Sequence, residues 1–141
     1  MSENETTKFN KKIIDEFRAN KGIVGAPFAE IPLLLLGTIG AKSGKSRLNP
    51  LAYNKEGKDI IVVASMAGAN QNPPWFYNLK ANPIVNVEID EDNFQAVAKI
   101  TEEPNRTDFY NRIEEKMPMF ADYKEKTNRI IPVILLERIL N

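Results

Sequence analysis

The chain has 141 residues, 43% of them hydrophobic, which suits one domain around a single core and is unlike a disordered composition. It contains no cysteine and no histidine, which excludes a disulfide framework, a thiol nucleophile and a Ser-His-Asp triad. The formal net charge is zero, and no long basic run indicates a nucleic-acid partner. No metal site is predicted, and an enzyme of this composition would use a bound cofactor for its chemistry.

The first predicted element is an amphipathic helix over residues 8–20, because apolar residues recur there at helical spacing. Thr6 or Thr7 is expected to cap this helix and Gly22 to end it. The helix and its lead-in would form residues 1–22, placed beside a main domain of residues 23–141. We expect its apolar face to dock on the core. Peripheral contact with a membrane surface is the alternative, because lysines flank that face.

Six strands and three shorter helices are predicted after this helix. The strands are expected over residues 31–38, 47–55, 59–65, 84–89, 94–101 and 130–139. Pro50 and Pro132 would interrupt two of them. The helices are expected over residues 74–80 and 104–117, with residues 120–126 a helix or an extended segment; Asn72 is the candidate cap of the first. The predicted fold class is α+β, with mainly antiparallel strands that close into a small barrel.

No signal peptide is visible, because the N-terminus is polar and charged. The apolar run at residues 33–36 is far too short to span a bilayer. We therefore predict a cytoplasmic protein.

The stretch GAKSGKS at residues 40–46 is similar to a phosphate-binding P-loop. A P-loop needs four residues between its first glycine and the final Gly-Lys-Ser, whereas only three separate Gly40 from Gly44. It must also open a helix, and Pro50 would fall inside that helix. We therefore reject the P-loop and predict a basic turn between two strands.

The distribution of charge singles out this turn. No acidic residue occurs between Ile31 and Lys55, whereas Lys42, Lys45 and Arg47 do. One interpretation is a solvated hairpin tip. The other is an anion site, to which serine hydroxyls and turn amides would add donors.

A loop of small residues follows the predicted strand at 59–65. If the first three strands form a meander, this loop and the basic turn lie at the same end of the sheet. The alanines and Gly68 would let a flat ligand approach the backbone. Trp75, the only tryptophan, would pack beside that ligand; plain core packing is the alternative. For Ser65 the alternative is a turn cap.

Six short motifs, in order along most of the chain, carry a family resemblance. They are residues 40–47 (GAKSGKSR), 50–51 (PL), 63–65 (VAS), 74–79 (PWFYNL), 81–83 (ANP) and 129–132 (RIIP). These motifs resemble those of the nitroreductase-type deazaflavin-dependent oxidoreductases, over residues 17–136. The resemblance implies a split β-barrel related to the FMN-binding fold. It also implies the cofactor coenzyme F420, an 8-hydroxy-5-deazaflavin with a phosphate and a glutamate tail.

The resemblance also implies which residues bind that cofactor. They are Ala41, Lys42, Ser43, Gly44, Lys45, Ser46, Arg47, Pro50, Val62, Val63, Ala64, Ser65, Met66, Pro74, Trp75, Phe76, Tyr77 and Asn78. Family members often carry arginine where Ala41 stands and lysine where Met66 stands. We therefore predict weaker cofactor affinity in this chain or a different contact with the tail, not loss of binding.

On the acceptor side, the matching positions are Ala52, Met117, Phe120 and Tyr123. Met117 and Phe120 favour flat, apolar acceptors such as quinones, although both are also ordinary core residues. Ser65 or Tyr123 would orient the acceptor or donate a proton to its oxygen.

The hypothesis is hydride transfer from reduced F420 to a quinone, an enone or a nitroaromatic compound. One alternative is an FMN-binding protein on the same barrel. A haem-binding protein on that barrel fits less well, because the chain lacks the histidine and cysteine that usually bind haem iron. Another is an F420 carrier without turnover. The expected partner is a small electron acceptor, and related split barrels often form homodimers.

Overall fold

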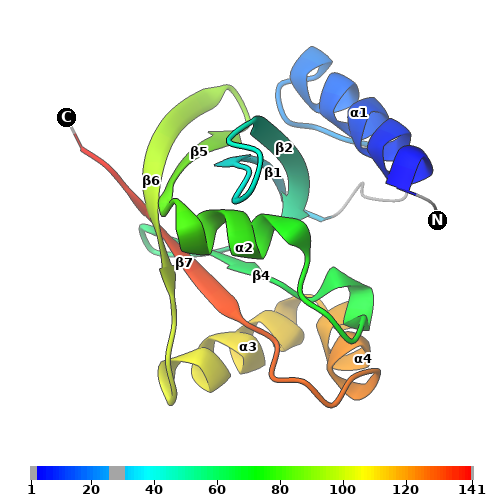
Figure 1. Ribbon diagram of the computed structural model, residues 1–141. Helices are drawn as coiled ribbons and strands as arrows, with labels where there is room; N and C mark the ends of the chain where they lie inside the picture. The colour runs from blue at the N-terminus through cyan, green and yellow to red at the C-terminus, as the bar shows by residue number, and fades with distance from the viewer. Residues whose placement is uncertain (1–2, 26–30, 141) are drawn as a thin grey trace.

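The computed structural model describes residues 3–25 and 31–140, with residues 3–6 described by their backbone only. They form seven strands, four α-helices and one 3-10 turn (Figure 1). The fold class is α+β, as predicted. A loop is expected over residues 22–27, and residues 26 and 27 of it lie outside the described residues.

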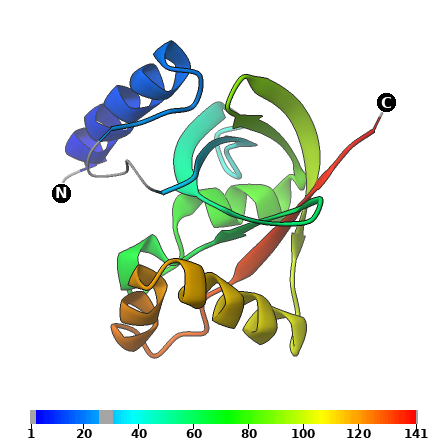
Figure 2. The same ribbon diagram turned by 180° about the vertical axis from the view of Figure 1, so that it is seen from behind.

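The strands belong to one antiparallel sheet with the order β2-β1-β5-β6-β7-β4-β3. Their bounds are β1 (Leu33–Ile39), β2 (Ser46–Ala52), β3 (Asn54–Glu56), β4 (Asp59–Val63), β5 (Ile84–Ile89), β6 (Asp92–Ile100) and β7 (Val133–Arg138). The sheet curls into a half-barrel, which Figures 1 and 2 show from opposite sides. Alternation in β5 is as predicted, with Val85 and Val87 buried in the core.

The prediction of six strands was wrong, because the strand expected over residues 47–55 is two strands. It breaks at Tyr53, whose N–H donates to the Pro32 carbonyl at 3.1 Å. β2 pairs with β1, whereas β3 pairs with β4 at the other end of the sheet order. Pro50 does not interrupt β2; it lies opposite Leu35, and an edge strand tolerates its missing N–H.

The meander considered for the first three strands is present, with its second strand divided between two ladders: β2 pairs with β1, and β3 pairs with β4. β4 pairs with β7 and shares no ladder with β2. Curling of the sheet nevertheless brings β2 and β4 into contact. Only Tyr53 separates β2 from β3, so two consecutive hairpins connect the basic turn after β1 with the loop after β4, as the meander implied.

Helix α1 (Glu3–Ala19) docks on the sheet, as expected. Ile13 and Phe17 are buried against Leu33 and Leu35 of β1, so most of the apolar face docks on the core, whereas Phe9 is 41% exposed. The helix begins before Thr6 and Thr7, so the predicted caps were wrong. No helix in the described part of the chain is long and apolar enough to cross a membrane. The division at residue 22 stays a prediction.

The remaining helices lie on two sides of the sheet. Helix α2 (Pro74–Ala81) fills the half-barrel with Trp75, Phe76 and Leu79, in the same core cluster as residues of β1, β4, β5, β6 and β7. Helices α3 (Asn105–Lys116) and α4 (Met119–Glu125) pack in a second cluster with β4 and β7. The 3-10 turn η1 (Met66–Gly68) contacts α4. Pro73, not Asn72, precedes the first turn of α2.

Candidate functional site

The basic turn, defined here as residues 40–47, joins β1 to β2. The Gly40 N–H donates to the Lys45 carbonyl at 2.8 Å, and the Gly44 N–H donates to the Gly40 carbonyl at 2.9 Å. A Cβ on Gly40 would lie 2.5 Å from Ser43 Oγ and 3.3 Å from the Lys45 carbonyl oxygen, so a larger residue would require the Ser43 side chain to move. β2 begins directly at Ser46, and no helix follows. The rejection of a P-loop is confirmed.

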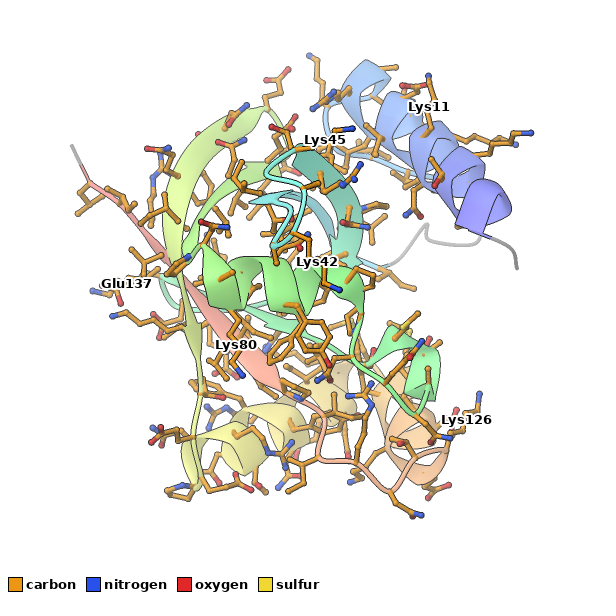
Figure 3. The ribbon with its side chains drawn as sticks, viewed as in Figure 1. Lys11, Lys42, Lys45, Lys80, Lys126 and Glu137 are labelled. Carbon is orange, nitrogen blue, oxygen red and sulfur yellow. The ribbon has the colours of Figure 1, made fainter. Side chains whose placement is uncertain are left out.

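The basic turn exposes uncompensated positive charge. Lys42, Lys45 and Arg47 are exposed, and within residues 7–25 and 31–140 no carboxylate pairs with them. Other surface arginines do find carboxylates, for example Arg18 with Glu88 at 2.7 Å. In Figure 3, Lys42 projects in front of α2 and Lys45 lies farther up the hairpin. Three unpaired cations on one turn favour an anionic ligand over a chance arrangement.

Asn78 of α2 ties the basic turn to the core. Its Oδ1 accepts a hydrogen bond from the Ala41 N–H at 3.0 Å, and its Nδ2 donates to Thr38 Oγ1 at 3.1 Å. Asn78 is 9% exposed and Thr38 2%. Because both ends of the amide are used, Asn78 holds the turn in place, a role that the sequence did not reveal.

The second part of the site is the donor loop, defined here as residues 65–68 after β4. Ser65 has right-handed φ and ψ of −79° and −35°. Met66, Ala67 and Gly68 follow with φ values of 47°, 54° and 84°. A right-handed residue followed by a left-handed one makes successive N–H groups converge on one side. The N–H groups of Met66 and Ala67 have no hydrogen-bond acceptor in the described part of the chain.

Arg129 fixes the donor loop from a distant part of the chain. Its guanidinium donates to the carbonyls of Ala64, Ser65 and Ala69 and to the Asn72 side chain. The sequence motif at residues 129–132 contained Arg129, but no role was predicted for it. These bonds could not be predicted from the neighbouring sequence, because Arg129 lies 64 residues from Ser65.

The predicted ring-contacting residues divide into core and surface. Val62, Val63, Ala64, Trp75 and Phe76 are buried in core clusters, which is the alternative given above for Trp75. Tyr77, Met66 and Pro74 are exposed, and Pro50 is half-buried. Ser65 is 7% exposed, and its hydroxyl makes no capping bond to η1. The Ser65 hydroxyl is therefore not committed to a turn cap.

The predicted acceptor residues come together in one hydrophobic cluster. Ala52, Met117 and Tyr123 are partly buried around it, and Phe120 is 4% exposed inside it. The Tyr123 ring meets the Phe120 ring edge-on, with 5.5 Å between centroids. The backbone of Tyr123 also touches the donor loop, because a Cβ on Gly68 would lie 2.8 Å from the Tyr123 carbonyl oxygen. Ser65 and Tyr123 thus belong to neighbouring elements.

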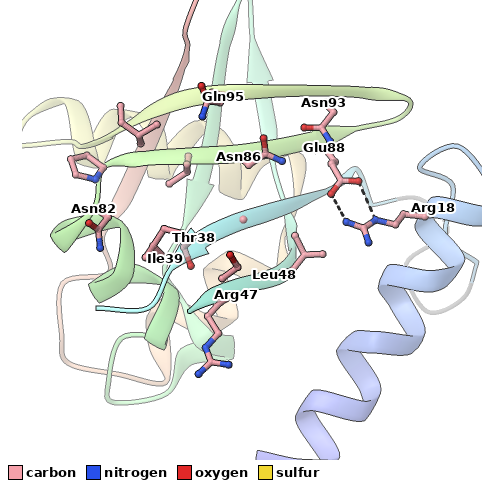
Figure 4. A pocket seen from close by; sticks show the side chains of 15 residues that line it. Arg18, Thr38, Ile39, Arg47, Leu48, Asn82, Asn86, Glu88, Asn93 and Gln95 are labelled. Atoms are coloured by element: carbon pink, nitrogen blue, oxygen red, sulfur yellow. Dashed lines mark hydrogen bonds and ion pairs between the residues drawn. The ribbon is translucent and has the colours of Figure 1, made fainter. Parts of the chain in front are cut away.

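A cavity of about 740 Å³ lies on the outer face of the sheet, between α1 and β1, β2, β5 and β6. Of the predicted cofactor residues, only Ser46 and Arg47 line it. Figure 4 shows the Arg47 guanidinium directed away from the amide side chains of Asn86, Asn93 and Gln95. This cavity is therefore separate from the region between the basic turn and the donor loop.

Comparison with solved structures defines the class of fold. A haem storage protein from Vibrio cholerae, HutZ, superposes with a TM-score of 0.63 at 16% identity, over 94% of this chain and 92% of that one. An FAD-binding protein from Mesorhizobium loti superposes with a TM-score of 0.55 at 15% identity, over 97% and 88%. At these identities only the fold is shared, a split-barrel arrangement.

The family follows from closer matches. Residues 10–138 match the F420H(2)-dependent quinone reductase family, and the chain belongs to it. An F420H(2)-dependent quinone reductase of Mycobacterium tuberculosis is 36% identical over 126 residues, 86% of this chain and 80% of the relative. The structure of an F420-H2 dependent reductase, FDR-A, is 37% identical with a TM-score of 0.69, over 75% of this chain and 94% of that one. The family resemblance is confirmed; the nitroreductase label stays a prediction.

Proposed function

We propose that this chain reduces a quinone, or a similar electron-poor acceptor such as an enone or a nitroaromatic compound, at the expense of reduced coenzyme F420. Its membership of the F420H(2)-dependent quinone reductase family carries the proposal. When bound, reduced F420 supplies the hydride. The role of the protein is to bind the cofactor and the acceptor, to orient them toward each other, and to exclude water.

The residues present fit an anionic, flat cofactor. Lys42, Lys45 and Arg47 are exposed, with no carboxylate partner in the described part of the chain, and would hold the phosphate and tail. The donor loop offers N–H groups, and Ala67 and Gly68 present little side chain beside them, so a planar ring can approach the backbone there. The two parts lie on elements that Asn78 and Arg129 hold in place.

The acceptor would bind beside the cluster that contains Met117, Phe120 and Tyr123. The partly buried side chains of this cluster, Met117 and Tyr123 among them, are apolar or aromatic, which suits a quinone ring. The hydroxyl groups of Ser65 and Tyr123 are the candidates for holding the acceptor oxygen or for giving it a proton, since the chain has no histidine.

The test is oxidation of reduced F420 by the purified chain with menadione, followed as the return of F420 fluorescence. We expect saturable turnover. Binding of F420 without oxidation by quinones, enones or nitroaromatics would instead support the carrier alternative. A purified protein with the absorption spectrum of a flavin, and not that of a deazaflavin, would support FMN.

We also propose a homodimer in the cytoplasm. A structure 32% identical to this chain, with a TM-score of 0.71 over 96% of this chain and 100% of that one, is a domain-swapped dimer. Light scattering after gel filtration would measure the mass, and a single species of about 16 kDa, the mass of one chain, would contradict the dimer.

A further inference from the structure

Arg129 lies in the segment between α4 and β7, and its side chain hydrogen-bonds to the loop after β4. Its Nε donates to the Ala69 carbonyl at 2.8 Å and its Nη1 to Asn72 Oδ1 at 2.6 Å. Its Nη2 donates to the carbonyls of Ala64 at 3.1 Å and Ser65 at 2.8 Å. Four of the five N–H donors of a guanidinium are thus used within the protein. Arg129 is therefore poorly placed to bind a ligand itself.

The backbone that Arg129 holds is strained. Met66 and Ala67 have φ values of 47° and 54°, although neither is a glycine. A left-handed residue with a Cβ costs about 1–2 kcal/mol. Such conformations persist only where the surroundings impose them, and they are concentrated at functional sites.

The bonds from Arg129 bracket this strained stretch. The carbonyls of Ala64 and Ser65 precede Met66, while Ala69 and Asn72 follow it. One rigid, planar group therefore fixes where the chain enters the left-handed turn and where it leaves. On the remaining side Gly68 packs directly on the α4 backbone.

The charge of Arg129 also lacks a counter-ion. All four acceptors are neutral oxygens, and no described carboxylate pairs with it. Burial lowers the pKa of Arg129 from its ordinary value, so placing the cation here has a desolvation cost. The cation is held here by four hydrogen bonds to this segment of the chain and not by an opposite charge.

We infer that Arg129 is a positioning residue for hydride transfer: it fixes the donor loop in the left-handed conformation that presents the Met66 and Ala67 N–H groups to the bound ring. This inference rests on the proposed function. Arg129 acts through the loop and touches neither the cofactor nor the acceptor.

Three variants and one control test the inference. Arg129→Lys keeps the charge and loses the planar fork, Arg129→Gln loses both, and Asn72→Ala removes one acceptor while the guanidinium stays. The control is Arg106→Gln. Arg106 donates to the Ile131 carbonyl at 2.9 Å, two residues from Arg129, but it makes no described bond to the donor loop.

The first readout is amide hydrogen exchange of the protein without cofactor. The N–H groups of Gly68 and Ala69 donate to Ser65 and Met66 at 3.0 and 3.1 Å, so their exchange reports whether the left-handed turn is formed. We expect faster exchange at these two amides in both Arg129 variants and no change in the Arg106 control.

The second readout is the oxidation of reduced F420 by menadione, well below the melting temperature of each variant. We expect kcat to fall roughly tenfold to a hundredfold in Arg129→Lys and Arg129→Gln, because small displacements of the reactants have effects of that size. The dissociation constant of F420 should change by less than about threefold, since the basic turn supplies most of the charged contacts.

An unchanged kcat in Arg129→Lys, or an equal loss in Arg106→Gln, would overturn the inference. If both Arg129 variants fail to fold, Asn72→Ala decides: a smaller fall in kcat with faster Ala69 exchange supports the inference, and wild-type values for both overturn it. Wild-type protein without any turnover would defeat the proposed function and this role together, whereas turnover that Arg129 does not affect defeats this role alone.

Discussion

The two halves of the candidate site handle positive charge in opposite ways. The basic turn holds Lys42, Lys45 and Arg47 in solvent, without carboxylate partners in the described part of the chain. The donor loop is held by one half-buried cation from elsewhere in the chain, Arg129, whose bonds go to the protein's own oxygens. A cation without a protein partner can bind a ligand, whereas a cation that is hydrogen-bonded to the backbone fixes the shape of that backbone. Affinity is therefore expected to depend on the turn, and geometry on the loop.

The glycines of the two regions show the same contrast. Gly44 of the basic turn and Gly68 of the donor loop both have positive φ, at 69° and 84°. A Cβ on Gly44 would meet nothing within 4 Å, whereas on Gly68 it would lie 2.8 Å from the Tyr123 carbonyl oxygen and 2.9 Å from Lys126 Cβ. The loop is packed and the turn is open.

The largest expected effect is that of Gly68→Ala. We expect the free energy of unfolding to fall by about 3 kcal/mol, from the left-handed φ together with overpacking against α4. Gly44→Ala, with the same strain but open space, should lower it by about 1 kcal/mol. Urea unfolding measures both. Equal losses would remove the contrast between the two regions.

Next in size is the double substitution Lys42→Ala with Arg47→Ala. We expect F420 to bind roughly tenfold to a hundredfold more weakly, because two charge-assisted contacts are lost. Stability should change by less than about 0.5 kcal/mol, since both side chains are exposed. Fluorescence titration at two salt concentrations measures the binding. Unchanged retention of the cofactor would refute the role of the basic turn.

A smaller effect is expected at Tyr110, which pins α4 behind the donor loop. Its hydroxyl donates to the Phe120 carbonyl at 2.6 Å, so Tyr110→Phe should lower the free energy of unfolding by about 1 kcal/mol at neutral pH. Burial, with Glu114 nearby, raises the pKa of Tyr110 from 10.0 to about 12.

A raised pKa sets the direction of the pH dependence. Tyr110 contributes fully below about pH 10, and its contribution is lost as the pH rises from there through about 12. Melting temperatures between pH 9 and 12 should therefore fall more steeply in the wild type than in Tyr110→Phe. Parallel curves would show that this hydroxyl does not stabilise the region behind the loop.

The smallest effect is expected from Met66→Lys, which adds a cation to the donor loop. Met66 is 43% exposed, so the new charge would be screened by solvent. We expect F420 to bind about twofold to fivefold more tightly, the size of an exposed ion pair. Met66→Gln is the neutral control, and an equal gain in both variants would show that charge is not the cause.

Local features were predictable from the sequence because their causes lie within a few residues. Helical spacing placed Ile13 and Phe17 on the buried face of α1, and period-two alternation placed Val85 and Val87 inside the half-barrel. The lack of acidic residues around the basic turn likewise anticipated cations with no described carboxylate partner. Each prediction depended only on neighbours along the chain.

Long-range partners were decided by the tertiary structure. β4 is a continuous apolar run buried on both faces, which fits many neighbours equally well. Nothing in it showed that β4 pairs with β7, and nothing near Pro50 showed that the strand there divides at Tyr53. Likewise, composition could not show that Arg129 reaches back 64 residues to Ser65. The sequence by itself thus determined the elements and the charge of the turn. Only folding, which sets backbone oxygens opposite a remote guanidinium, determined the shape of the donor loop.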